Sequence, residues 1–171
     1  MKLEHYEPEY ASYFVRMFLE PVIKTHGVNI DKAFPNLRIW LGAKPPFEAN
    51  ADKNNLWHEN YRRPHFTEND GLFYCVIPDL FKGILPPTER IYTLCHEIGH
   101  YVHTVYLKDD MEKWAKWAAE TGHRLDTEFK NDGGYPRITS HEDFAIDFSK
   151  IALGQCKNIN YYMKLLKNGI A

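Results

Sequence analysis

The five residues His96-Glu97-Ile98-Gly99-His100 constrain the fold of this chain more than any other feature. No proline interrupts residues 88–103, and their apolar periodicity predicts one continuous helix. Because an α-helix returns to the same face about every 3.6 residues, His96 and His100 are expected one turn apart on one face. Two imidazoles at this spacing can bind a single Zn²⁺. Glu97 lies about 100° away around the helix and can reach a water beside the metal without binding the metal itself.

Two neighbouring features bear on this interpretation. Gly99 costs about 1 kcal/mol of helix stability relative to alanine, so we expect it to make room for a close neighbour. Pro86-Pro87-Thr88-Glu89 is typical of a helix start, with Thr88 as the N-cap or a proline at the first position. The competing interpretation is an ordinary amphipathic core helix with two hydrogen-bonded histidines.

A catalytic zinc needs a third protein ligand, and the sequence offers several. His103 continues the face of the two histidines, but it lies about 10 Å along the helix axis from His96, too far to share one metal. Glu120 has a workable spacing from His100. However, Gly122 suggests that a helix ends there, which predicts a solvated side chain at Glu120.

Glu142 is the third ligand that the sequence favours. It lies near the start of a second predicted helix that Ser140 can cap, and Phe144, Phe148 and Ile151 give this helix a core stripe. A carboxylate at the start of a buried helix can meet two histidines across a helix–helix contact. The alternatives that stay open are Glu120, Asp143 and His141.

These residues resemble those of gluzincin metallopeptidases, specifically the compact catalytic domain shared by anthrax lethal factor and the Pro-Pro endopeptidases. In that family H-E-x-x-H is followed, some forty to fifty residues later, by a Glu-x-Phe-Ala-type helix, and a tyrosine lies seven residues before its glutamate. Here Glu142-Asp143-Phe144-Ala145 begins 46 residues after His96, and Tyr135 lies seven residues before Glu142. The resemblance covers residues 71–153. It implies His96, His100 and Glu142 as ligands of one Zn²⁺ per chain, Glu97 as the general base and Tyr135 as the oxyanion donor.

The sequence differs from the family pattern at one position, and a second family has a similar first motif. The acidic residue often found four positions after the glutamate ligand is Ile146 here, so Asp147 or Asp143 would have to accept the second N–H of a ligand histidine. The first motif is also similar to that of repressor-cleaving metallopeptidases of mobile elements, which read H-E-[IL]-G-H-Y followed by a histidine. Those proteins usually have a shorter gap and often an attached helix-turn-helix, which we do not find here.

The resulting expectation is a zinc-dependent metallopeptidase acting on a peptide or protein substrate. In this chemistry Glu97 takes the proton of an attacking water, and Tyr135 lies in a turn-rich loop suited to holding a donor over the substrate. The alternatives are a repressor-cleaving metallopeptidase and a non-catalytic zincin-fold module that binds a partner. The glutamate of the motif favours catalysis, because a binding site has no use for it.

Composition and charge limit the number of domains and the kinds of partner that we expect. With 171 residues, 44% of them hydrophobic, the chain is expected to form one domain over residues 1–171. A net charge of −2 gives no electrostatic case for nucleic acid or an anionic membrane. No apolar stretch approaches the ~20 residues that span a bilayer. The start of the sequence, residues 1–7, lacks the basic and apolar regions of a secretory signal, so we expect a cytoplasmic protein. The three cysteines are odd in number and show no paired spacing, so we expect free thiols. The oligomeric state stays open.

The expected elements define the fold class. Strands are predicted at 37–41 and 72–77, the second after a turn at 69–71. The second strand is expected either inside the sheet or at an edge that pairs with an extended substrate, and 61–66 is a possible short edge element. Besides the motif helix and the Glu142 helix, further helices are predicted at 111–119 and 160–167. An amphipathic N-terminal helix is predicted from Tyr10, broken or kinked near Pro21 and ending by Gly27. The expected fold is α+β: a zincin-like single domain, mostly helical, with a small mixed sheet beside the H-E-x-x-H helix.

Overall fold

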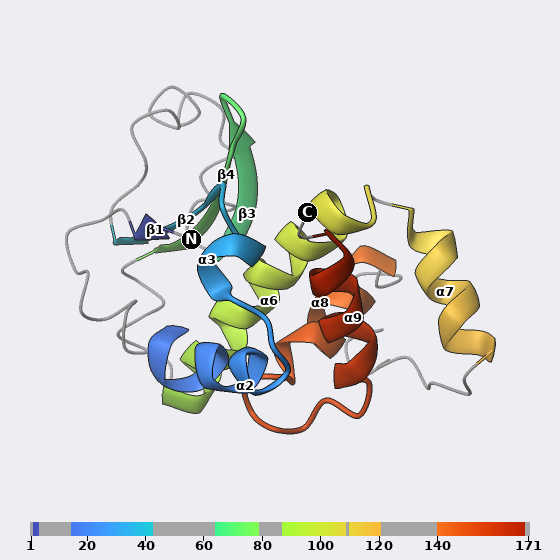
Figure 1. Cartoon of the computed structure of the whole chain (residues 1–171). Helices are drawn as coiled ribbons and strands as arrows, with labels where there is room; N and C mark the ends of the chain where they lie inside the picture. Colours follow the sequence, from blue (N-terminus) through green and yellow to red (C-terminus); the bar gives the residue numbers. More distant parts are fainter. Residues whose placement is uncertain are drawn as a thin grey trace, which may run out of the picture.

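The structure is a computed structural model that describes residues 2–3, 15–42, 64–78, 87–108, 110–120 and 140–169. In these residues a small mixed sheet and a group of helices pack together, with one long helix between them (Figure 1). The predicted α+β class, mostly helical with a small mixed sheet beside the motif helix, is confirmed.

Four strands form the described sheet in the order β1 (Lys2–Leu3), β2 (Leu37–Gly42), β4 (Leu72–Pro78) and β3 (His65–Asn69). The pairs β1–β2 and β2–β4 are parallel, whereas β3 pairs antiparallel with β4. The strands predicted at 37–41 and 72–77 are confirmed. β4 has a neighbour on each side, so the interior alternative is correct for it. β3, which shares only its first two residues with the predicted edge element, forms one edge of the described sheet, and β1 forms the other.

The β3–β4 hairpin turns at Asp70 and Gly71, as the sequence predicts. Their φ angles are +54° and +76°. Positive φ at both central residues is the signature of the type I′ turn, whose twist matches that of the flanking strands. This turn sets the register in which Asn69 pairs with Leu72 and His65 pairs with Val76.

The helical part begins with a short π-helix, η1 (Val15–Leu19), that continues directly into a regular helix. The α-helices are α2 (Glu20–Thr25), α3 (Ile30–Ala33), α6 (Pro87–Tyr106), α7 (Met111–Glu120), α8 (Ser140–Ser149) and α9 (Ile159–Gly169). The four longer helices correspond to predicted helices, and the described part of the predicted N-terminal helix is η1 and α2, which ends at Thr25. Pro87 is the first residue of α6, where its missing N–H costs nothing.

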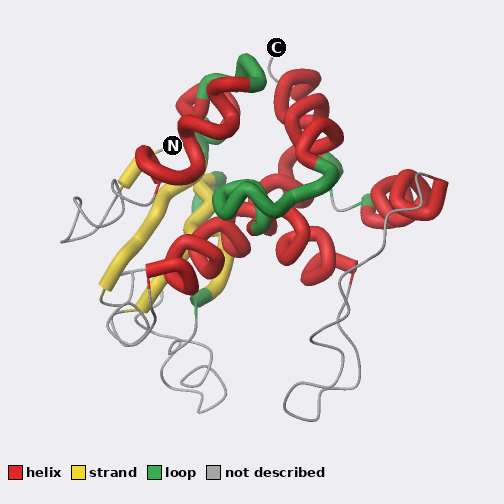
Figure 2. Tube along the Cα trace, turned by 90° about the horizontal axis from the view of Figure 1, so that it is seen from below, coloured by secondary structure: helices red, strands yellow, loops and turns green. Residues whose placement is uncertain are grey.

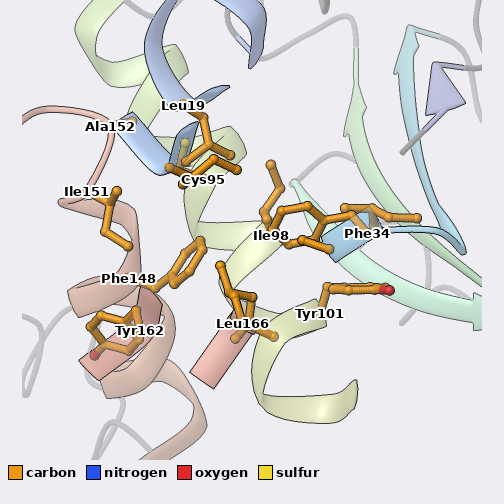
Figure 3. Close-up of a cluster of buried hydrophobic side chains, with 14 of the residues drawn as sticks. Leu19, Phe34, Cys95, Ile98, Tyr101, Phe148, Ile151, Ala152, Tyr162 and Leu166 are labelled. Carbon is orange, nitrogen blue, oxygen red and sulfur yellow. The ribbon is translucent and has the colours of Figure 1, made fainter. Parts of the chain in front are cut away.

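The motif helix α6 is the centre of the fold. It contacts β3 and β4 on one side and α8 and α9 on the other, while α7 lies beyond α8, away from the sheet (Figures 1 and 2). Its apolar side is buried in the main hydrophobic core, where Ile98 and Tyr101 lie among side chains from η1, α3 and α9 (Figure 3). A helix packed on both sides in this way has little freedom to rotate or slide. Its polar residues are therefore held in fixed directions.

All three cysteines lie among the described residues. Cys75, Cys95 and Cys156 are free thiols, as predicted, and burial raises the pKa of Cys95 to about 12. Cys95 is therefore a small core residue. No helix among the described residues combines the length and the apolar character that a bilayer span requires.

Candidate metal centre

Two helices bring three potential metal-binding side chains together. His96 and His100 extend from α6, one turn apart, with ring centroids 4.9 Å from each other. Glu142, in the first turn of α8, places one carboxylate oxygen 3.0 Å from Nε2 of His96 and the other 3.1 Å from Nε2 of His100. Their potential ligand atoms all lie within 4.8 Å of one another. This arrangement is consistent with an H-E-x-x-H-type site.

A close helix–helix contact produces this geometry. A Cβ added to Gly99 would stand 2.9 Å from the Cα of Ala145, closer than real Cβ contacts come. Gly99 faces α8 one residue before His100, and Ala145 lies one helical turn after Glu142. The absence of a side chain at Gly99 therefore lets the two helices approach until the carboxylate of Glu142 reaches the histidines. The expectation that Gly99 makes room for a neighbour is confirmed.

The donor set fits a zinc ion. Two imidazole nitrogens and one carboxylate are a common protein ligand set for catalytic zinc, which keeps a fourth position open. Bonds of about 2.0–2.1 Å in a tetrahedron place neighbouring ligand atoms about 3.3 Å apart. In the structure each imidazole Nε2 faces a different oxygen of the Glu142 carboxylate, at 3.0 and 3.1 Å, and one potential ligand atom from each of the three residues lies within 4.8 Å of the others. These residue types and this clustering fit one zinc ion.

The pKa values of His96 and Glu142 are shifted by the groups around them. Burial by itself would lower the pKa of His96, but the hydrogen bond with Glu142 and the negative charges of Glu97 and Glu142 together raise it. Burial would likewise raise the pKa of Glu142, yet its hydrogen bonds to His100 and His96 and their positive charges hold it well below its usual range. Both directions describe the same interaction: a carboxylate kept ionised by the two imidazoles that it faces. Such a carboxylate is ready to bind a cation.

Glu97 differs from Glu142 in its surroundings. It is only 5% exposed, and burial raises the pKa of its carboxyl group. The positive charges of His96, His100 and His65 oppose this rise, whereas the charge of Glu142 adds to it. A carboxyl group with a raised pKa, next to the two histidines but outside the group of three, is suited to accept a proton and release it again.

The other residues considered for the third ligand lie elsewhere in the described structure. Glu120 is the last residue of α7 and is exposed, as its position before a glycine predicts. Asp143 and His141 are half-buried neighbours of Glu142 on α8, and neither joins the described group of three. Tyr135, the expected oxyanion donor, lies outside the described residues.

Sequence reasoning missed the residues that surround the two histidines. His103, rejected above as a ligand, contacts His100 directly: Nε2 of His103 lies 2.8 Å from Nδ1 of His100. The spacing i, i+3 on a helix was the available signal, because it puts the two rings on neighbouring turns of one face. Phe66 of β3 and Tyr92 of α6 flank His100 and His96, with ring centroids 6.3 and 6.4 Å away. The contact with Phe66 depends on tertiary packing, which no local spacing encodes.

Comparison of the chain with protein-family models, with curated proteins and with solved structures gives no match. The functional argument therefore depends on the chemistry of these side chains.

Proposed function

We propose that this protein is a zinc-dependent metallopeptidase of the gluzincin type, in which His96, His100 and Glu142 hold one Zn²⁺. The observation that supports this most directly is the pair of contacts by which one carboxylate faces both imidazole Nε2 atoms from a second helix, at 3.0 and 3.1 Å. A buried carboxyl group, that of Glu97, lies beside them. Two ligands and a base on one helix, with a third ligand across a helix contact, form the complete donor set of this class.

Glu97 is the proposed general base. Zinc, when bound, supplies a Lewis acid that polarises the scissile carbonyl and makes a water acidic near neutral pH. As that water adds to the carbonyl carbon, a carboxylate oxygen of Glu97 takes its proton. The same oxygen then delivers a proton to the departing amine nitrogen as the C–N bond breaks. The raised pKa of Glu97 suits both halves of this transfer, because it brings the group closer to the working pH.

Two further roles belong to the proposal. Tyr135 is proposed to donate a hydrogen bond to the developing oxyanion, on the spacing that the family resemblance supplies. Replacing it with phenylalanine would then cost about 10²–10³ in rate, the usual value of one oxyanion donor, with zinc retained. β3 is proposed to pair with an extended peptide substrate, since it is an edge strand of the described sheet and carries Phe66, next to His100.

The test is the variant Glu97→Gln, measured for zinc content and for cleavage of a mixed-sequence library of quenched fluorescent peptides. Glutamine fills the same space but cannot take the proton, so zinc should remain at one per chain while the rate falls about 10²–10⁴-fold. Glu112→Gln is the matched control, because Glu112 lies exposed on α7. Equal rates in Glu97→Gln and wild type would remove Glu97 from the mechanism. Zinc binding without any cleavage in the wild type would favour a non-catalytic binding module.

A further inference from the structure

The second ring nitrogen of His100 has a partner that the proposed reaction does not use. Nε2 of His100 faces Glu142, so this atom is the one directed toward the metal position. Nδ1, on the opposite side of the ring, lies 2.8 Å from Nε2 of His103. At this distance the two nitrogens share one hydrogen, in a direct imidazole–imidazole hydrogen bond. The contact links His100 to a residue one turn further along α6.

The direction of this hydrogen bond follows from what a metal ligand needs. If Nε2 of His100 gives its lone pair to zinc, the neutral ring carries its proton on Nδ1. Nδ1 then donates, and Nε2 of His103 must accept. His103 in turn carries its own proton on Nδ1, which lies 3.5 Å from Oγ1 of Thr104. One arrangement of protons therefore satisfies both the hydrogen bond and metal binding.

His103 is held firmly enough to fix the ring that it contacts. It is 4% exposed, and its ring packs against His141 and Phe144 of α8, with centroids 4.8 and 5.7 Å away. The helix that supplies Glu142 thus also supplies the packing around His103. Both ring nitrogens of His100 are therefore contacted by side chains that belong to α8 or pack against it, and these contacts fix the orientation of the ring.

Two positions considered for this role do not supply the acceptor of His100, because residue 146 is not an acid and Asp147 has a partner on α9. The position four residues after Glu142 is Ile146, which is buried and has no acceptor in its side chain. Asp147, one residue later, accepts a hydrogen bond from the hydroxyl of Tyr162 on α9. In most zinc sites a carboxylate, a backbone carbonyl or a water accepts the second N–H of a ligand histidine. In this chain the contact at 2.8 Å gives that position to an imidazole.

We propose that His103 is a positioning residue that accepts the Nδ1–H of His100, fixing its tautomer and ring orientation for zinc. The proposal rests on the zinc site of the proposed function, but not on peptide cleavage. A neutral imidazole acceptor polarises the ligand ring less than a carboxylate does. It holds the ring without adding negative charge beside Glu97 and Glu142.

The test measures zinc dissociation constants by competition with a chromogenic chelator, for the wild type and for three variants. His103→Phe keeps a ring but removes the acceptor, and it should weaken zinc binding about 10–100-fold, the usual effect of losing such a partner. His103→Gln can place its amide oxygen near the position of Nε2 and should recover most of the affinity. Val102→Ala, a buried change on another face of α6, should lower the melting temperature without changing zinc affinity.

A second readout separates ring orientation from general stability. With Co²⁺ in place of zinc, His103→Phe should change the visible absorption spectrum, whereas His103→Gln and Val102→Ala should keep that of the wild type. Wild-type zinc affinity in His103→Phe would overturn the positioning role and leave the zinc site intact. Failure of the wild type to bind zinc would overturn both this proposal and the proposed function. If His103→Phe does not fold, His103→Asn takes its place, because its shorter amide cannot reach Nδ1 of His100.

Discussion

Gly99 and Ala145 mark the point of closest approach between the two helices that carry the candidate metal centre. A Cβ placed on Gly99 would meet the Cα of Ala145 at 2.9 Å and its Cβ at 3.3 Å. The nearest atom belongs to the backbone, so no change of rotamer could relieve the contact. The position of Glu142 relative to His96 and His100 therefore depends on a hydrogen atom, and not a methyl group, at residue 99.

Gly99→Ala should accordingly destabilise the protein, although alanine is the better helix former. Helix propensity alone would favour the variant by about 1 kcal/mol. Forcing α6 and α8 apart costs about 1–3 kcal/mol, the usual penalty for overpacking, so the net effect is expected to be a loss. Zinc affinity should fall as well, since the carboxylate of Glu142 moves away from the imidazoles. Thermal unfolding and zinc titration of the variant measure both effects.

Thr93→Ala on the same helix is the control for Gly99→Ala. Thr93 is half-buried on α6 and belongs to none of the proposed site residues, so this change should leave zinc affinity unchanged. A Gly99→Ala variant that is more stable than the wild type, with unchanged zinc affinity, would show that the helices do not need this close contact.

Glu142→Ala tests the third ligand directly. Removing the carboxylate leaves two histidines, which are not enough for a catalytic zinc site, so zinc should be lost or bound much more weakly. Asp143→Ala is the matched control: the same charge, one residue further along α8 and outside the group of three, should be removable with zinc retained. Elemental analysis of purified protein gives zinc per chain for each variant. The reverse outcome, with zinc lost only in Asp143→Ala, would move the third ligand to Asp143.

Much of the fold could be predicted because local pattern and tertiary role agree in α6. Its apolar period, its proline at the first position and the two histidines of the motif are all visible over twenty consecutive residues. The type I′ turn at Asp70 and Gly71 is similarly local, because backbone conformation there follows from residue type. Gly99 could be singled out as costly in a helix, but only the structure shows that Ala145 is the neighbour for which it makes room.

The environment of the site could not be predicted to the same depth, because it is made by contacts between distant segments. β3 was only partly recognised: its pairing partner β4, more than its own pattern, defines it as a strand. The contact of Phe66 with His100 joins that strand to α6. His103 was judged only as a ligand, on its distance along the helix from His96. Its contact with the ring of His100 depends on side-chain direction, which spacing alone leaves undecided.

Glu97→Gln should make the metal-free protein more stable at neutral pH while it removes activity. Burial raises the pKa of Glu97 above 4.5, its ordinary value. An acid whose pKa is higher in the folded state than in the unfolded state costs stability once the pH passes the unfolded value. The difference in melting temperature between variant and wild type should therefore be small below pH 4.5, grow as the pH rises through the folded pKa, and then stay constant. A variant that is less stable at neutral pH would indicate that the ionised carboxylate is compensated by its surroundings.

The metal-free protein should also show a pH window set by His96 and Glu142. The pKa of Glu142 lies below its usual 4.5, so its contribution to stability is present above pH 4.5 and is lost as the pH falls toward its folded value. The pKa of His96 lies above its usual 6.5, so its contribution is present below pH 6.5 and is lost as the pH rises through the higher folded value. The stabilisation from this contact should therefore be fully present between pH 4.5 and 6.5.

With zinc bound, the stability of the protein should increase, and not decrease, as the pH rises above 6.5. Zinc needs a neutral imidazole at His96, so a proton competes with zinc for this ring. Because the pKa of His96 is raised, a proton already competes at pH values above 6.5. Melting temperatures with a chelator and with excess zinc, measured on both sides of pH 6.5, should diverge as the pH rises, the first falling and the second increasing. His96→Gln removes the titrating group together with one proposed zinc ligand, so excess zinc should no longer raise its melting temperature and the two curves should coincide. Parallel curves in the wild type would mean that zinc binds without displacing a proton from His96, and the contact with Glu142 would then not be the one that the metal replaces.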